Sequence, residues 1–102
     1  MIFVIASIQI KAGKREAFLK EFHQVVPLVR QEEGCLEYGP TLDVQTDIPA
    51  QGDVRLNHVT IVEKWESLEH LKAHLVAPHM SEYRNRVKEL VEATRLQVLE
   101  PA

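Results

Sequence analysis

Histidine is the residue type in this chain best suited to chemistry near neutral pH, and four of its five copies lie between residues 58 and 79. His70 and His74 stand four residues apart with Glu66 one turn earlier, a spacing that lets one helix face hold a metal ion. His70, however, points away from the leucines of the same segment, and His74 lies at the border of that apolar stripe. We therefore expect solvated histidines in this segment and no metal site.

His79 follows Pro78, a residue suited to the first turn of a helix. There the free N–H groups and the helix dipole disfavour the imidazolium form. A neutral imidazole can accept a proton near pH 7, so His79 is a candidate general base. The alternative is a histidine that only occupies the start of the helix. Trp65 and Tyr83 can line an aromatic pocket, although both residue types also pack in ordinary cores.

Several classes of chemistry have no support in the sequence. The chain lacks GxSxG, P-loop, GxGxxG and CxxC motifs, and its single cysteine, Cys35, excludes an intramolecular disulfide. Twelve Lys and Arg residues are scattered among fifteen Asp and Glu residues, which predicts no nucleic-acid partner and no anionic membrane surface. No apolar run is long enough to span a bilayer and no signal peptide is evident, so we expect a cytoplasmic protein.

The N-terminal third predicts a strand followed by a helix. Residues 2–10 form a β-branched run that indicates a largely buried strand. From Lys14 the apolar period changes to that of an amphipathic helix of about five turns. We expect Pro27 to bend this helix and Gly34 to end it. The residues of the apolar stripe are Phe18, Phe22, Val25 and Val29.

The middle of the chain predicts two strands joined by a long loop. Residues 35–45 alternate as a half-buried strand, and Gly39-Pro40 favours an edge position or a bulge. Residues 46–55 have turn chemistry and are expected to cover another part of the protein. Residues 57–65 indicate a third strand. The apolar face expected for the strand at 35–45 consists of Leu36, Tyr38, Leu42 and Val44.

The C-terminal part predicts two short helices and a last strand. Ser67 suits the start of the first helix, whose apolar face carries Leu68, Leu71 and Leu75. Pro78 begins the second helix, and residues 94–100 form the final strand. The apolar stripe expected for the second helix contains Met80, Tyr83, Val87, Leu90 and Val91.

The resulting order, β-α-β-β-α-β, predicts a ferredoxin-like α+β domain over residues 1–102, with its second helical region broken at Pro78. In this split βαβ arrangement the helices cover one sheet face. The opposite face carries apolar residues on strands 2–10 and 57–65. We therefore expect a homodimer in which two sheets pack face to face as a dimeric α+β barrel.

Two segments of the chain resemble segments of a known protein family. They are VVPLVRQEEGCLEYGPTLD at 25–43 and VEKWESLEHLKAHLVAPHMSEY at 62–83. Together they resemble the antibiotic biosynthesis monooxygenase family, and most closely its bacterial quinol monooxygenases. The most specific elements are EEGC, E-x-W-E-S at 63–67 and HL-x-AHL-x-x-PHM at 70–80. The resemblance implies a ferredoxin-like dimer that oxidises an electron-rich phenol or quinol with O2, without flavin, haem or metal.

Such chemistry needs a base and a cavity that excludes water, because a deprotonated quinol can itself pass electrons to O2. His79 and His74 are the candidates for the base and its hydrogen-bond partner. Trp65, Tyr83 and Phe22 are expected to line the pocket for a small aromatic substrate. Polar contacts would come from the strand residues Ser7 and Asn57.

Three alternatives remain at this point. The haem-degrading branch of the family is disfavoured, because its Asn and Trp fall at Ser7 and His74 in this chain. An isomerase of the autoinducer-processing type shares the spacing of His74 and Pro78-His79. A dimeric stress or ligand-binding protein without turnover would bind the same ligands without consuming oxygen.

Overall fold

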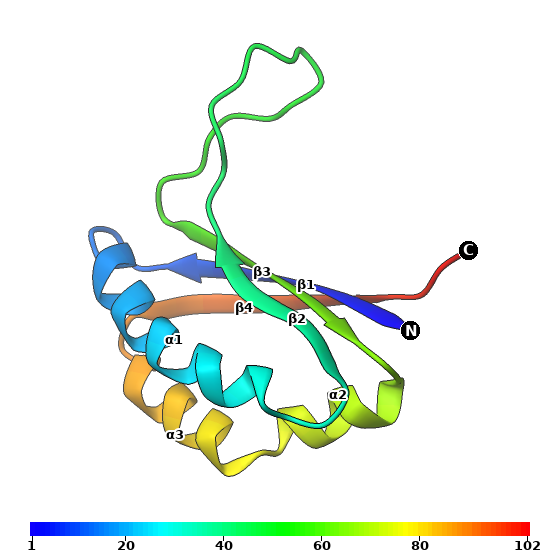
Figure 1. Ribbon diagram of the computed structural model, residues 1–102. Coiled ribbons are helices and arrows are strands. Elements are labelled where there is room, and N and C mark those ends of the chain that lie inside the picture. The colour runs from blue at the N-terminus through cyan, green and yellow to red at the C-terminus, as the bar shows by residue number, and fades with distance from the viewer.

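The chain folds into a four-stranded sheet with its helices packed on one of the two faces (Figure 1). The computed structural model describes residues 1–102. All neighbouring strands are antiparallel, in the order β2-β3-β1-β4. The predicted ferredoxin-like α+β fold is therefore confirmed. The elements are β1 (Ile2–Ile10), α1 (Arg15–Arg30), β2 (Cys35–Thr41), β3 (His58–Trp65), α2 (Leu68–Leu75), α3 (Pro78–Val87) and β4 (Val91–Leu99).

The core lies between the sheet and α1. Alternate residues of the central strands β1 and β3 point toward the helices and are buried, as the period of two requires. The buried stripe of α1 packs against them and includes the predicted phenylalanines and valines. Pro27 lies inside α1 on its exposed side, as predicted. The inward residues of the two strands are Val4, Ala6, Ile8, Ile10, Val59, Ile61, Glu63 and Trp65.

The turn between α1 and β2 differs from the prediction. The helix ends at Arg30, four residues before Gly34, which was predicted to end it. Gly34 instead occupies the last position of this turn with φ of +80°, a left-handed conformation that glycine adopts without strain. A side chain at Gly34 would overlap the ring of His70 on α2. The turn at residues 31–34 is thus pressed against α2.

The strand predicted at 35–45 is shorter in the structure. β2 is an edge strand, as Gly39-Pro40 indicated, but it ends at Thr41. Its pairing with β3 shifts between Cys35 and Glu37, which interrupts the expected alternation. Of the four residues expected on its apolar face only Tyr38 is buried, whereas Leu36, Leu42 and Val44 are exposed.

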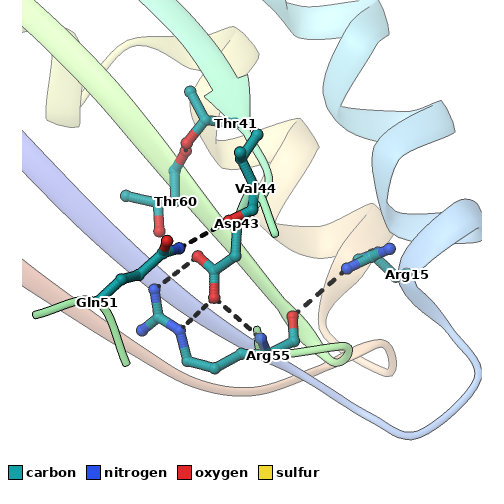
Figure 2. A network of polar contacts seen from close by, with 7 residues as sticks. All are labelled: Arg15, Thr41, Asp43, Val44, Gln51, Arg55 and Thr60. Carbon is teal, nitrogen blue, oxygen red and sulfur yellow. Dashed lines mark hydrogen bonds and ion pairs between the residues drawn. The ribbon is translucent and has the colours of Figure 1, made fainter. Parts of the chain in front are cut away.

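Residues 42–57 form an arm that extends beyond the sheet instead of covering it (Figure 1). Its base is closed by Arg55, whose Nε and Nη2 donate to the two carboxylate oxygens of Asp43 at 2.8 and 2.9 Å (Figure 2). The Arg55 backbone N–H donates to the same carboxylate. Further along the arm, Gln51 Nε2 donates to the Val44 carbonyl at 2.7 Å. The arm therefore has a fixed base although it lies outside the core.

The C-terminal elements follow the prediction with one shift. Ser67 caps α2, where its side chain accepts the His70 N–H, and Pro78 begins α3. α3 ends at Val87, and β4 begins at Val91, three residues before the predicted start. Leu90 and Val91 therefore belong to the turn and to β4, and not to the helical stripe. No helix is both long and apolar enough to span a membrane.

Gly34→Ala should destabilise the fold by roughly 1–3 kcal/mol, because alanine is strained at this φ and its Cβ would displace His70. Gly52→Ala is the matched control, since a Cβ there meets nothing within 4 Å. Urea unfolding of both variants measures the difference. Equal stability of the two variants would show that the 31–34 turn is not constrained by α2.

Candidate active site

A cavity of about 360 Å³ lies between the helix-covered face of the sheet and α3. Eleven of its sixteen lining residues are hydrophobic, and they come from every strand and helix of the fold. Two of these eleven are tyrosines, and the five polar lining residues are Glu63, His74, Arg84, Lys88 and Thr94. A mostly apolar cavity with a few convergent polar groups is the usual form of a small-molecule site.

His74 is buried, contrary to the prediction of a solvated face. The residue is 1% exposed, and its ring centroid lies 4.7 Å from that of Trp65 and 5.3 Å from that of Tyr38. His74 and Leu71 are three residues apart, so they share the face of α2 that meets the sheet. His70 is half-buried and its Nδ1 lies 2.7 Å from Ser67 Oγ. Neither histidine is simply solvated.

Glu32 connects the two candidate catalytic histidines. One oxygen, Oε2, lies 2.9 Å from His74 Nδ1 and 2.7 Å from His79 Nε2. A carboxylate only accepts hydrogen bonds, so both ring nitrogens donate to it. Glu32 belongs to the turn that precedes β2, far in sequence from either histidine. The sequence offered only its place in the EEGC element, which did not single it out.

The hydrogen bond to Glu32 leaves His74 with its other nitrogen, Nε2, free to act. With Nδ1 as the donor, Nε2 of the neutral ring is an acceptor, and it has no hydrogen-bond partner in the protein. The only buried side-chain polar atom without a partner is His58 Nε2. His74 Nε2 is therefore not sealed in the core and opens to the cavity that His74 lines.

The environment keeps His74 neutral. Burial lowers the pKa of the imidazole from its ordinary value of 6.5, and the Glu32 hydrogen bond opposes that shift without cancelling it. At pH 7 the ring is therefore a free base. A proton taken up at Nε2 would produce an imidazolium beside the Glu32 carboxylate, which stabilises it, as in a carboxylate–histidine dyad.

Glu63 is a second buried titratable group that the sequence reasoning missed. It lies on β3 with an exposed fraction of 5%, and its Oε1 accepts the Trp65 Nε1–H at 2.9 Å. Burial raises the pKa of Glu63 to about 7, with a smaller contribution in the same direction from Glu32. The only sequence signal was its place in E-x-W-E-S.

Tyr38 and Tyr83 bring two hydroxyl groups to the cavity. Burial raises the pKa of both phenols, so both remain protonated and can donate hydrogen bonds. Their rings pack on Phe22, with centroid separations of 5.6 and 5.5 Å. The aromatic groups thus form one wall of the cavity, and their hydroxyls have no partner in the protein.

The predicted site residues separate into two groups. His74, Tyr83 and Phe22 line the cavity together. Trp65 is fully buried behind Glu63 and does not line it, and His79 lies behind Glu32, outside the lining.

Ser7 and Asn57 do not reach the cavity. Ala6 and Ile8 point inward, so Ser7 must face the opposite side of the sheet. Asn57 precedes β3, and its carbonyl accepts the Ile10 N–H at 2.8 Å. No group of three or more His, Cys, Asp and Glu side chains is arranged to hold a metal ion.

The sequence profile described as antibiotic biosynthesis monooxygenase matches residues 1–86. This chain belongs to the antibiotic biosynthesis monooxygenase family. Its relatives include a protein named "Probable quinol monooxygenase YgiN" from Escherichia coli (strain K12), 38% identical over 99% of this chain and 98% of that protein. The protein of the same name from Shigella flexneri matches equally well. The predicted family resemblance is therefore confirmed.

Solved structures share the fold of this family member. Rv0793 from Mycobacterium tuberculosis superposes with a TM-score of 0.79 at 25% identity, covering 99% of this chain and 94% of that one. PA3566 from Pseudomonas aeruginosa gives a TM-score of 0.80 at 22% identity, over 99% of this chain and 93% of that one. The ferredoxin-like architecture is thus common to proteins of very different sequence.

The pKa of His74 in this monooxygenase-family chain provides a test of the Glu32 contact. An NMR titration should give a pKa below 6.5 for His74. Glu32→Gln should lower it further, because it removes the carboxylate that favours the imidazolium. Glu37→Gln, at an exposed carboxylate, is the control and should leave the His74 pKa unchanged. A higher His74 pKa in the Glu32→Gln variant would contradict the assigned hydrogen bond.

Proposed function

We propose that this protein is a cofactor-independent monooxygenase that oxidises a quinol or an electron-rich phenol with O2. The observation that carries the proposal is the free Nε2 of His74, which opens into an apolar cavity and is backed by the Glu32 carboxylate. Membership of the monooxygenase family supports the reaction type. The name of the Escherichia coli relative supports a quinol as the substrate class.

The substrate can supply every electron the reaction needs. Loss of a phenolic proton turns a quinol into an anion that donates electrons to O2. One oxygen atom then replaces a ring hydrogen, and the other leaves as water. The overall change is quinol plus O2 to hydroxyquinone plus water, in which four electrons pass from the substrate and no external reductant is required.

His74 accepts the phenolic proton in this proposal. Its ring is neutral, its free nitrogen opens to the cavity, and Glu32 stabilises the charge that develops. His79 donates to the same Glu32 oxygen and holds the carboxylate in position. The base and partner roles expected from the sequence are therefore exchanged between the two histidines.

The residues that line the cavity exclude water from the substrate. Phe22 and the two tyrosine rings offer an aromatic surface for a planar ring. The Tyr38 and Tyr83 hydroxyls can hydrogen-bond the substrate oxygens, because both stay protonated. Exclusion of water strengthens each of these contacts and protects reactive oxygen intermediates.

Oxygen uptake with reduced menadione tests the function and the base together. Chelator-treated protein should consume O2 faster than a protein-free control, which corrects for autoxidation of the quinol. His74→Ala should lower kcat/KM at least about tenfold, because a positioned base contributes roughly 10²–10⁴-fold. His79→Ala should have a smaller effect, and the exposed His23→Ala none.

Thermal melts of each variant separate lost chemistry from lost folding. Quinol binding without oxygen uptake by the unaltered protein would instead indicate a ligand-binding protein. Activity lost on chelation and restored by Zn²⁺ or Fe²⁺ would contradict the cofactor-independent mechanism.

The proposal includes a homodimer formed through the sheet face that no helix covers (Figure 1). Phe3, Ile5 and Val62 bring apolar surface to this face. His58 lies on it too, and its Nε2 is buried without a partner, which an interface residue can provide. A second copy buries the apolar face and leaves the cavity on the opposite side free.

Sedimentation velocity at micromolar concentration should show a dimer. Val62→Glu should produce a monomer, because it places a carboxylate in the centre of the interface. Leu28→Glu on α1 is the matched control, since Leu28 is 47% exposed compared with 37% for Val62, but lies on the helical side. A stable monomer for the unaltered chain would contradict the sheet-to-sheet dimer.

A further inference from the structure

Glu63 is the one carboxyl group that lines the cavity. It lies on β3 opposite Tyr38 in the strand register, and both side chains face the helices. Oε1 is held by the Trp65 indole N–H at 2.9 Å, and the Trp65 ring itself packs on His74. The orientation of the carboxyl group is thus set by the same aromatic residue that contacts the proposed base.

The second oxygen of Glu63 is free to meet a ligand. Oε2 has no hydrogen-bond partner in the protein, yet it is not among the sealed polar atoms, which comprise His58 Nε2 alone. Since the whole residue is 5% exposed, the access of Oε2 is through the cavity. Glu63 Oε2 and His74 Nε2 therefore face one space from two different elements.

We propose that Glu63 is a catalytic acid that protonates the oxygenated substrate, while His74 accepts the phenolic proton. The inference rests on the proposed quinol monooxygenase function and extends it. It gives the cavity separate acid and base groups, because the reaction needs one group to remove the phenolic proton and another to protonate the peroxide.

The proton balance can be followed atom by atom. His74 takes the phenolic proton, and the ring carbon gives two electrons to O2 as a C–O bond forms. Glu63 protonates the distal oxygen of this peroxide. The Glu63 carboxylate then takes the C–H proton, the carbon becomes a carbonyl and the O–O bond breaks. The departing hydroxide accepts the proton held by His74 and leaves as water. Both residues return to their starting states.

The environment prepares both groups for these roles. Burial raises the pKa of Glu63 to about 7, whereas burial lowers the pKa of His74. Opposite shifts in one cavity are the usual mark of an acid and base pair. The other titratable groups around Glu63 are Glu32 in the turn, Cys35 and Tyr38 on β2, and Tyr83 and Arg84 on α3.

Glu63→Gln tests the acid directly, because the amide oxygen can still accept the Trp65 N–H but the group can no longer deliver a proton. Without this proton the peroxide is expected to leave as H2O2, so quinol plus O2 gives quinone plus H2O2. We expect O2 uptake to persist while hydroxyquinone formation falls at least about tenfold. Chromatography of products and oxygen returned by catalase measure this partition.

Glu37→Gln is the matched control, since Glu37 is an exposed carboxylate on the adjacent strand, and it should leave the products unchanged. In the unaltered protein the hydroxyquinone yield per O2 should fall as the pH rises through about 7, where Glu63 loses its proton. Trp65→Phe should move this fall to higher pH, because the indole N–H lowers the pKa of Glu63.

Infrared titration observes Glu63 without any turnover. A carboxylic acid band should vanish as the pH rises through about 7 in the unaltered protein and be missing from Glu63→Gln. Absence of this band, or an unchanged product partition in the active variant, would overturn the acid role and leave the monooxygenase function standing. Failure of the unaltered protein to consume O2 with quinols would overturn both.

Discussion

The structure of the cavity depends on one carboxylate that accepts hydrogen bonds from two histidines. Glu32 lies in the turn after α1, His74 near the end of α2 and His79 at the start of α3, so this contact joins three parts of the chain. Each histidine is held by a charge-assisted bond, which is stronger than a neutral one. Without Glu32 the buried His74 would have a polar atom with no partner, which is costly in a core.

The same apolar surroundings act in opposite directions on the two kinds of titratable group. Desolvation disfavours the charged form of each, so it makes the Glu63 carboxyl a weaker acid and the His74 imidazole a weaker base. Near neutral pH the His74 ring is therefore predominantly uncharged and the Glu63 carboxyl group is partly uncharged. A cavity in this state can bind a neutral aromatic molecule and still exchange protons with it.

The two faces of the sheet serve different purposes. The helix-covered face encloses the cavity, and the period of two sends Glu63 and Tyr38 into it from neighbouring strands. The opposite face carries the apolar residues Phe3, Ile5 and Val62 and the buried, unpartnered Nε2 of His58, and it is the face on which the proposed second copy packs. The arm at 42–57 extends from this sheet, and the ion pair between Asp43 and Arg55 closes its base (Figure 2).

The sequence by itself determined the element order, the ferredoxin-like topology and the split at Pro78, because periodicity, Ser67 as a cap and proline are local signals. Local signals also placed Phe22 and Tyr83 on apolar stripes. They could not reveal Glu32, since its partners are 42 and 47 residues away. Nor could they identify Glu63 or the burial of His74, because side-chain period alone does not say which polar residue on an inward face will meet a cavity. The tertiary structure decided these features, since desolvation and long-range hydrogen bonds exist only after the sheet and helices have packed.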